Sequence, residues 1–352
     1  MALKEEQQAP LAEQEPAGPT RGARAWTTAR GLLIGRPETG ALFGAAAMFV
    51  VFAFIAPSSD TFTSRISLAG LASITAELGI IAMAVTLLMI AGHFDLSVGS
   101  VLGFSSFIVA DLIIHHGVNG WVSAAIAVLI ALGIGLVNGI LVVVTRIPSF
   151  IVTLGTLLIW RGVLFGISGG QPAEVPQENF IFKIFSYRFT SGPLQGYQVS
   201  LLWFLAVIAV LTFLLLRTRF GNWIFASGGN ERAARSMGVP VDRVWLVLFL
   251  ITAAASCLTG LIQVGRFGVV EATRGQGIEL QAIAAAVIGG ARLNGGYGSV
   301  LGAALGALMI AMIQQGLVLS GFASYWLNVA IGALLITAVV VNQVLGRTRP
   351  QL

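Results

Sequence analysis

The chain has 352 residues, of which 56% are hydrophobic and only 10% are charged. A mean hydropathy of +0.89 excludes one or two ordinary soluble domains, in which about a quarter of the residues are charged. The sequence therefore indicates an integral membrane protein. Basic residues give a formal net charge of +5, but they are scattered between apolar stretches, so no nucleic-acid partner is expected.

The first 36 residues, 1–36, are polar and contain proline and glycine. This composition predicts a disordered cytoplasmic N-terminal tail. A secretory signal is not expected, because it would need an apolar core close behind the basic residues and a small-residue cleavage site, whereas the first apolar run begins a membrane span. Residues 348–352 are expected to form a short cytoplasmic C-terminal end.

Apolar stretches long enough to cross a bilayer as helices recur after residue 40, and they are too long and uniform for barrel strands. We predict an all-α, polytopic membrane protein whose transmembrane domain covers residues 37–347. It should contain about ten transmembrane helices, including short or discontinuous ones, and the eighth is the shortest. The predicted spans are Ala41–Ala56, Leu68–Ala91, Leu96–Ile114, Trp121–Val144, Ile151–Ser168, Val199–Leu216, Val244–Gly265, Ile278–Gly290, Ser299–Gly316 and Trp326–Leu345.

The distribution of basic residues predicts the orientation of these spans. With the N-terminus in the cytoplasm, ten spans bring the C-terminus back to the cytoplasm. Fourteen of the 20 Lys and Arg residues are then cytoplasmic and five are outside, while Arg161 lies within a span. This bias favours the proposed orientation. The longest outside loop, residues 169–198, is large enough to contact an extracytoplasmic partner, and a plain connector is an equal alternative.

The segment AGHFDLSVGS, residues 91–100, places an aspartate and two serines within apolar sequence. A charge at bilayer depth costs about 2.5–3.5 kcal/mol, so Asp95 should face protein or an aqueous cavity. Arg161 is a candidate partner for it. We expect a helix-breaking turn beside a permeation path, in which Asp95 holds backbone amides; direct substrate contact is the alternative. The candidate residues are Asp95, Ser97, Gly99 and Ser100.

A glycine-rich segment, residues 275–302, surrounds one short apolar run. Glycines let helices approach closely or end, which predicts a discontinuous span that lines a cavity. Its candidate pathway or helix-break residues are Glu279, Gly289 and Gly290. Stabilisation of a helix N-terminus without substrate contact is an equal alternative for Glu279.

These two segments also suggest an internal duplication. The sequence GSVLG occurs at residues 99–103 and again at 298–302, and Glu77 and Glu279 begin similar patterns. A parallel repeat would place both turns at the same membrane face. Chance recurrence of glycine turns in a glycine-rich protein is an equal alternative.

The cytoplasmic loop of residues 218–243 has the signals of a short helix. Asn230 is a suitable N-cap, Glu231 fits the first turn, Arg235 lies near the end, and Gly238 ends the helix. A helix of about two turns is not stable alone, and its small apolar residues favour docking into protein over resting on lipid.

Four motifs occur in order along the chain: AGHFDLSVGS, IPSFIVTLGT, ASGGNERAARSMGV and GIELQAIAAAVIGGARLNGGYGSVLG. Together they resemble the ribose/xylose/arabinose-type permease family of bacterial ABC importers, over nearly the whole chain after residue 40. The chain departs from the family pattern at His93 and Phe94, where a second glycine and an aliphatic residue are common. His93 is expected to be a packing residue rather than a proton relay, because no second histidine lies near it.

The resemblance implies a multi-pass permease subunit of the bacterial inner membrane, with both termini in the cytoplasm, that passes a neutral monosaccharide or polyol. Its implied partners are cytoplasmic ATP-binding subunits, a periplasmic sugar-binding protein, a second permease copy in a homodimer or related heterodimer, and the lipid membrane. No cofactor, metal or catalytic residue is implied. The implied contacts of the ATPase-coupling loop are Gly229, Asn230, Glu231, Ala234, Arg235 and Gly238.

The lysine content supports this division of labour independently. A phosphate-binding P-loop needs a lysine after a glycine-rich run, and neither Lys4 nor Lys183 has that setting. The chain is therefore not expected to be an enzyme, and ATP hydrolysis is expected on partner subunits. The alternative function is an ion-coupled secondary transporter that uses Asp95, Glu77 and Glu279, which would not need the capped cytoplasmic loop.

Overall fold

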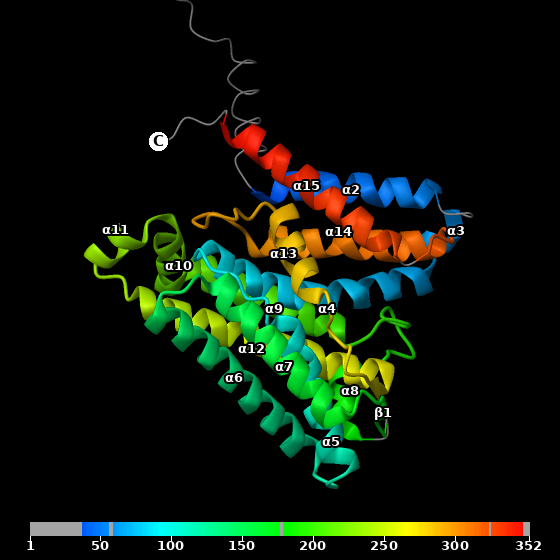
Figure 1. Ribbon diagram of the computed structural model, residues 1–352. Helices are drawn as coiled ribbons and strands as arrows, with labels where there is room; N and C mark the ends of the chain where they lie inside the picture. The colour runs from blue at the N-terminus through cyan, green and yellow to red at the C-terminus, as the bar shows by residue number, and fades with distance from the viewer. Residues whose placement is uncertain (1–36, 56–58, 177–178, 324, 348–352) are drawn as a thin grey trace, which may run out of the picture. The chain divides into compact units, whose positions relative to one another are not determined.

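The computed structural model describes residues 37–55, 59–176, 179–323 and 325–347, and within them the fold is almost entirely helical (Figure 1). The predicted tail of residues 1–36 and the end of residues 348–352 lie outside the described residues. The named strands of the described part form one antiparallel pair, β1 (Ala173–Glu174) with β2 (Val269–Val270).

A helix is present at each of the ten predicted spans: α2 (Pro37–Ile55), α4 (Arg65–Ile90), α5 (Val98–Ile114), α6 (Gly120–Thr145), α7 (Ser149–Ser168), α9 (Ser200–Arg217), α12 (Val241–Phe267), α13 (Ile278–Ile288), α14 (Val300–Leu319) and α15 (Trp326–Arg347). In the described part, six helices, α4, α6, α7, α9, α12 and α14, are long and apolar enough to cross a membrane. The other four contain shorter apolar segments, Glu38–Phe54, Val98–Ile114, Ile278–Ile288 and Trp326–Val340. The chain is a polytopic, all-α membrane protein. The 11 residues of α13 span about 16 Å at 1.5 Å per residue, which confirms the short eighth span.

Four short helices connect the long ones: α3 (Ser59–Thr63), α8 (Phe180–Ser186), α10 (Arg219–Gly229) and α11 (Glu231–Ser236). Only α11 was predicted from the sequence. The side chain of Asn179 caps α8, and that of Thr218 caps α10, by accepting a backbone N–H in the first turn. In the loop of residues 169–198, Ile181 and Phe182 are almost fully buried, so α8 anchors this loop against the helices.

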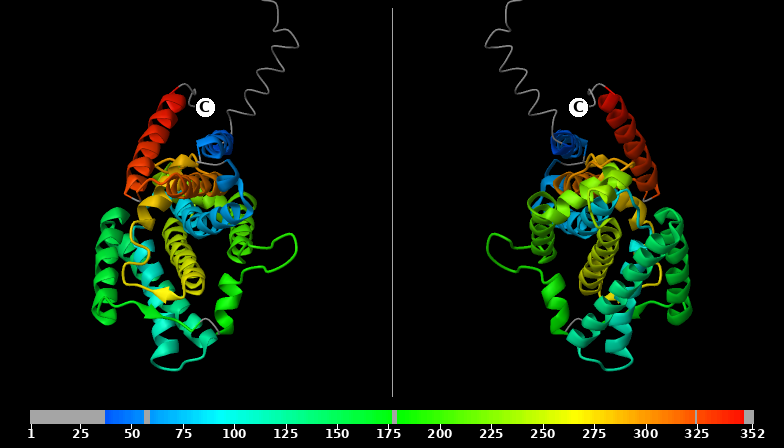
Figure 2. Two further views of the ribbon diagram at one scale, coloured as in Figure 1. Left: turned by 90° about the vertical axis from the view of Figure 1, so that its right-hand side faces the viewer. Right: turned by 90° about the vertical axis from the view of Figure 1, so that its left-hand side faces the viewer.

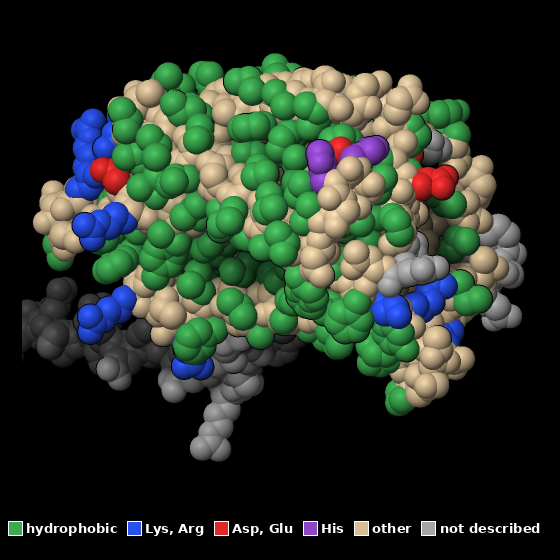
Figure 3. Space-filling model, turned by 90° about the horizontal axis from the view of Figure 1, so that it is seen from below, with side chains coloured by type: hydrophobic (Ala, Val, Ile, Leu, Met, Phe, Trp, Pro, Cys, Tyr) green, Lys and Arg blue, Asp and Glu red, His purple; other side chains and the backbone are tan. Residues whose placement is uncertain are grey.

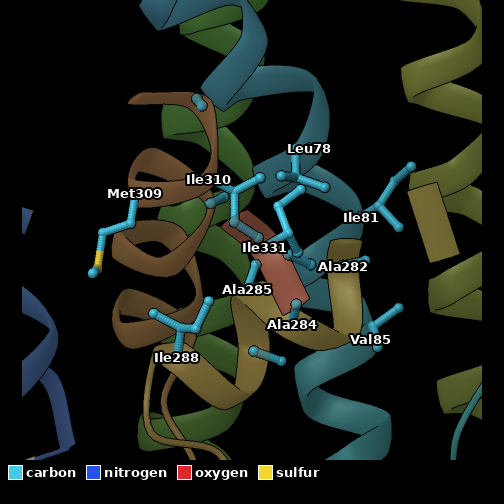
Figure 4. Packing of buried hydrophobic residues seen from close by; sticks show 14 of the residues in the cluster. Leu78, Ile81, Val85, Ala282, Ala284, Ala285, Ile288, Met309, Ile310 and Ile331 are labelled. Atoms are coloured by element: carbon cyan, nitrogen blue, oxygen red, sulfur yellow. The ribbon is translucent and has the colours of Figure 1, made fainter. Parts of the chain in front are cut away.

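Helix α4 is the centre of the bundle, and 94% of its most apolar window is buried. It packs against α14, α12, α13 and α9. Leu78, Ile81 and Val85 of α4 meet side chains of α13 and α14 in one apolar cluster (Figure 4). Helix α12 has a similar role among α5, α6 and α8, and Figure 2 shows it enclosed by its neighbours in the end-on views.

The outer helices present apolar side chains to the surroundings. Only 39% of the most apolar window of α6 and 22% of those of α7 and α9 are buried. Leu129, Leu158 and Phe213 are all more than 60% exposed. Figure 3 shows a face on which apolar side chains predominate, with Lys and Arg towards its two opposite edges. Such a surface suits lipid, because the hydrocarbon region excludes charge from lipid-facing positions.

Candidate functional site

In the turn between α4 and α5, both carboxylate oxygens of Asp95 accept hydrogen bonds. Asp95 is 1% exposed. Its Oδ1 accepts hydrogen bonds from the backbone N of Ser97 at 2.9 Å and from the Ser97 hydroxyl at 2.6 Å. Its Oδ2 accepts from the Thr252 hydroxyl of α12 at 2.7 Å. The carboxylate thus ties the turn to itself and to α12 through neutral donors.

The remaining polar groups of this turn are bonded to α6 and α7. Asn138 Nδ2 donates to the Ser97 hydroxyl at 2.8 Å, and the Ser100 hydroxyl donates to the Leu157 carbonyl at 2.9 Å. Arg161 is not the partner of Asp95: its Nη1 donates to the backbone carbonyls of Ala272, at 3.0 Å, and of Arg274, at 2.7 Å. Sequence spacing could not show which acceptor Arg161 takes.

A second buried carboxylate, Glu77, lies on α4 and pairs with α12. Its Oε1 is 2.6 Å from Arg266 Nη1, and its Oε2 accepts from Gln263 Nε2 at 3.0 Å. The predicted span ended at Gly265, whereas α12 extends to Phe267 and therefore carries Arg266. The pair leaves Glu77 satisfied within the bundle rather than open to a path.

Glu279, at the start of α13, is the least engaged of the predicted pathway residues. Its Oε1 accepts from the backbone N of Gly277 at 3.1 Å. Its Oε2 is buried and has no hydrogen-bond partner among the described residues. Gly99 of α5 packs directly against this oxygen and against the Gly275 carbonyl, so a side chain there would overlap both. The starts of α5 and α13 are therefore in contact.

The turn between α13 and α14 repeats the geometry of the α4–α5 turn. Gly92 and Gly290 have φ of 89° and 93°, which places both in the left-handed region that favours glycine. In each turn the next residue, His93 or Ala291, donates its backbone N–H to a carbonyl five residues back. The two turns meet, because Gly296 N donates to the Ile90 carbonyl at 2.8 Å.

This meeting places both turns at one end of the bundle, as the internal duplication requires. The two GSVLG segments are nevertheless not equivalent. Residues 99–103 begin one residue inside α5, whereas residues 298–302 straddle Ser299, the N-cap of α14. The duplication therefore rests on the two turns rather than on the GSVLG motif.

The predicted coupling helix is α11, which is six residues long, shorter than the expected two turns. Its N-cap is confirmed, since the Asn230 side chain accepts from the backbone N of Ala233 at 3.0 Å. Asn230 is also the C-cap of α10, so this one residue, with extended backbone, separates the two helices. Ala234 is buried, while Met237 is 84% exposed. Gly238, with φ of 80°, directs the chain into α12.

A network of ion pairs holds α11 to the neighbouring helices. Arg235 pairs with Glu231 at 3.0 Å and with Asp242 of α12 at 2.6 Å. Arg146, the C-cap of α6, binds the same Asp242 carboxylate at 2.9 and 3.2 Å. Hydrogen bonding to Asp242 raises the pKa of Arg235, which therefore stays charged. Each pair is partly exposed and contributes little alone, but together they fix α11 against α6 and α12.

Trp245 connects this network to the α4–α5 turn. The guanidinium groups of Arg146 and Arg235 lie 5.5 and 5.6 Å from the centre of its ring. The ring of His93 contacts it edge-on, with the ring centres 4.2 Å apart. Burial lowers the pKa of His93 to about 4, so the ring is neutral at pH 7. The prediction that His93 is a packing residue is confirmed.

A cavity of about 360 Å³ lies between α11, the α4–α5 turn and the start of α7. Gly92, His93, Arg146, Glu231 and Trp245 contribute to its wall. Sequence reasoning found His93 and Glu231 but missed Arg146, Asp242 and Trp245. In the sequence, Arg146 is only a basic residue at the end of one span, and Asp242 and Trp245 are only an acidic and an aromatic residue at the start of another. Nothing in the sequence shows that the end of α6 and the start of α12 meet.

Comparison with known proteins agrees with this architecture. A family described as "Branched-chain amino acid transport system / permease component" matches residues 66–339. The chain is 34% identical, over 76% of its length and 74% of the relative, to the xylose/arabinose import permease protein XylH of Sulfolobus acidocaldarius. It is 32% identical, over 84% of its length and 91% of the relative, to the ribose import permease protein RbsC of Escherichia coli K12.

A third relative is the autoinducer 2 import system permease protein LsrC of Photorhabdus luminescens, which is 32% identical over 77% of this chain and 78% of that protein. These matches confirm the resemblance to ribose/xylose/arabinose-type permeases that the sequence motifs indicated. The matched region includes α4 to α14 and thus both turns and the coupling loop. The chain belongs to the family described as "Branched-chain amino acid transport system / permease component".

Proposed function

We propose that this chain is the membrane subunit of a binding-protein-dependent ABC importer for a neutral monosaccharide or polyol. The observation that carries the proposal is α11, a short capped helix at one end of the bundle whose charged side chains are pre-arranged by Asp242 and Arg146. Relatives named as ribose and xylose/arabinose import permeases support the substrate class.

In this proposal the end that carries α11 faces the cytoplasm, where ATP-binding subunits receive the helix. Both termini then lie in the cytoplasm of a bacterial cell, and the loop of residues 169–198 faces a periplasmic sugar-binding protein. Two permease copies, identical or related, form the path. Contact residues with the ATPase are Gly229, Asn230, Glu231, Ala234, Arg235 and Gly238, and ATP hydrolysis takes place on the partner subunits.

The engagement of the buried charges favours a neutral substrate over an amino acid, the substrate in the family's description. A zwitterion needs both a free cation and a free anion in the path. Asp95 and Glu77 have their own donors, and Glu279 keeps one free oxygen, but Arg161 already donates to two carbonyls. Sugar hydroxyls can instead donate to and accept from neutral groups.

Among the predicted pathway residues, Glu279 is the best candidate for substrate contact. Its side chain is partly exposed, but its unpartnered Oε2 is buried against Gly99, so this oxygen could accept a sugar hydroxyl only when the starts of α5 and α13 separate. Asp95, Ser97 and Ser100 are buried and already bonded within the bundle. They are therefore proposed to hold the turn beside the path, together with the close-packed glycines Gly99 and Gly289 and with Gly290, whose φ is 93°.

Two of the three carboxylates of the ion-coupled alternative are already engaged. Asp95 accepts from hydroxyl and amide donors and Glu77 is paired with Arg266, whereas Glu279 alone of the three keeps an oxygen without a partner among the described residues. The three relatives reported above are named as permease proteins of xylose/arabinose, ribose and autoinducer 2 import, and none is named as an ion-coupled transporter.

The test is assembly and uptake with the cognate ATP-binding subunits and binding protein. Glu231→Ala and Arg235→Ala should reduce co-purification of the ATPase, or uptake, at least fivefold while the chain still inserts into the membrane. Arg243→Ala serves as the matched control, since Arg243 is exposed one residue beyond Asp242 and takes no part in the ion pairs. Normal assembly and uptake in both α11 variants would contradict the proposed role of the loop.

The substrate class is tested separately with the wild-type transporter. A competition panel of pentoses, hexoses, polyols and branched-chain amino acids should show inhibition of uptake by one or more sugars or polyols. Inhibition by leucine or valine alone would replace the proposed substrate with the amino acid.

A further inference from the structure

Three backbone segments meet at Gly228, next to the last residue of α10. Any Cβ at this position would overlap the Ile90 carbonyl oxygen and lie 2.8 Å from the Gly296 backbone nitrogen. The same Gly296 N–H donates to Ile90 O at 2.8 Å. The end of α10 therefore touches the ends of both turns, with no side chain between them.

The contact is tight from the other side as well. A Cβ at Gly295 would lie 2.9 Å from the Gly228 carbonyl oxygen and 3.0 Å from the Cα of Gly92. A contact between side chains can yield by a change of rotamer, but a contact between backbones cannot. Displacement of one segment must therefore displace the others, because close-packed interiors transmit strain.

Helix α11 is joined to this contact by a single residue. Asn230 ends α10 and caps α11, so a push on α11 reaches Gly228 within a few residues of backbone. On its other side the α4–α5 turn borders the cavity of about 360 Å³, so it has room to move. Asp95 in that turn then links the movement to α12.

We propose that Gly228 is a positioning residue for transport, which passes the displacement of α11 to the α4–α5 and α13–α14 turns as one backbone unit. The proposal rests on the proposed function, since it requires an ATPase to displace α11. It adds a specific route from the coupling helix to the two turns beside the path.

The first test is Gly228→Ala in the complete transporter reconstituted with its ATPase and binding protein. The added methyl must push Ile90 and Gly296 away, so the variant should assemble and hydrolyse ATP while uptake per ATP hydrolysed falls at least tenfold. Gly133→Ala is the control, because nothing lies within 4 Å of a Cβ at Gly133 in the middle of α6. An unchanged ratio of uptake to hydrolysis in Gly228→Ala would overturn the proposal.

A second measurement remains decisive if Gly228→Ala does not assemble. Arg232 of α11 and Asn294 of the α13–α14 turn are exposed, and Cys257 is buried, so Arg232→Cys/Asn294→Cys allows a spin label to be attached to each segment. If the segments move as one unit, the distance between the two labels should be the same in the nucleotide-free transporter and in the transporter trapped with ATP. A change of that distance between the two states would show relative movement and contradict the proposal.

These outcomes separate the inference from the proposed function. Wild-type uptake that proceeds without ATP-binding subunits would contradict the proposed function itself. ATP-driven wild-type uptake with full coupling in Gly228→Ala, or a change of the distance between the two labels, would contradict the role of Gly228 alone.

Discussion

The α4–α5 and α13–α14 turns have the same backbone geometry but are held in different ways. Side chains hold the first: Asp95 bonds to Ser97 and Thr252, and His93 packs on Trp245. Direct backbone-to-backbone contacts at glycines hold the second turn. Gly289 packs on the backbone of Gly302, and Gly306 packs on the Ala285 carbonyl.

The difference indicates how each turn should respond to substitution. A turn held by hydrogen bonds depends on the chemistry of its side chains, whereas a turn held by close backbone contact depends on their size. The first turn connects to α11 through Trp245, whose ring lies near the guanidinium groups of Arg146 and Arg235, and both turns contact Gly228. Both connections converge on the same end of the bundle.

The largest effect is expected from Gly289→Ala, which would break the glycine-held turn. The added methyl overlaps the backbone of Gly302, and backbone has to shift to accept it. Overpacking of this kind costs about 1–3 kcal/mol or more. The melting temperature of the purified protein in detergent should fall, whereas in Gly133→Ala it should stay equal or rise, because alanine favours a helix interior. Equal melting temperatures for Gly289→Ala and the wild type would refute close packing at this turn.

The next effect is expected from Asp95→Ala, which removes the acceptor at the centre of the other turn. Loss of hydrogen bonds to a buried charged group costs about 1.5–3 kcal/mol, because the donors of Ser97 and Thr252 lose their partner. Asp95→Asn keeps the shape and can bond to both residues, so its melting temperature should lie much closer to that of the wild type. If Asp95→Asn were as damaging as Asp95→Ala, the negative charge rather than the hydrogen bonds would be the essential property.

A smaller effect is expected from Asn138→Ala, which removes one hydrogen bond from the edge of the same turn. Its Nδ2 bonds only to the Ser97 hydroxyl in the described part of the chain. The expected loss of stability is about 1 kcal/mol. A double variant with Asp95→Ala should lose less than the sum of the two, since both substitutions act through Ser97. Strict additivity would argue against a shared network.

The smallest effect on stability is expected from Arg146→Ala. Its side chain is 50% exposed, and exposed ion pairs contribute about 0–1 kcal/mol. Its loss should change the melting temperature little but lower uptake per ATP hydrolysed, because Glu231 of α11 and Asp242, which binds Arg235 of α11, both lose their ion pair with α6. A variant with wild-type coupling would limit the network to a structural role.

The long spans could be predicted from the sequence because each is a continuous apolar run of membrane length, as in α4 and α12. The α11 helix was also predictable, since its cap lies within a few residues of the helix it caps. Contacts between distant segments could not be predicted. Arg146 and Asp242 are 96 residues apart in sequence, and Glu77 and Arg266 are 189 apart, so only the fold brings them together.

The position of glycines illustrates the same limit. The glycine-rich character of residues 275–302 indicated close packing, but Gly228 gave no separate signal beside Gly229 in the coupling loop. Only the coordinates distinguish them: a Cβ at Gly228 overlaps backbone, while a Cβ at Gly229 meets nothing within 4 Å. Helix α10 was missed because it follows α9 with a single intervening residue.

The most direct test of the account is uptake in proteoliposomes that contain this chain with or without its ATP-binding subunits. When the vesicles contain this chain with its ATP-binding subunits, ATP is enclosed inside and the binding protein is added outside, a labelled sugar or polyol should accumulate. Glu231→Ala should reduce the amount of sugar accumulated per ATP hydrolysed. Accumulation by the chain alone, driven by an imposed proton or sodium gradient and insensitive to ATP, would contradict the assignment of α11 as the coupling element.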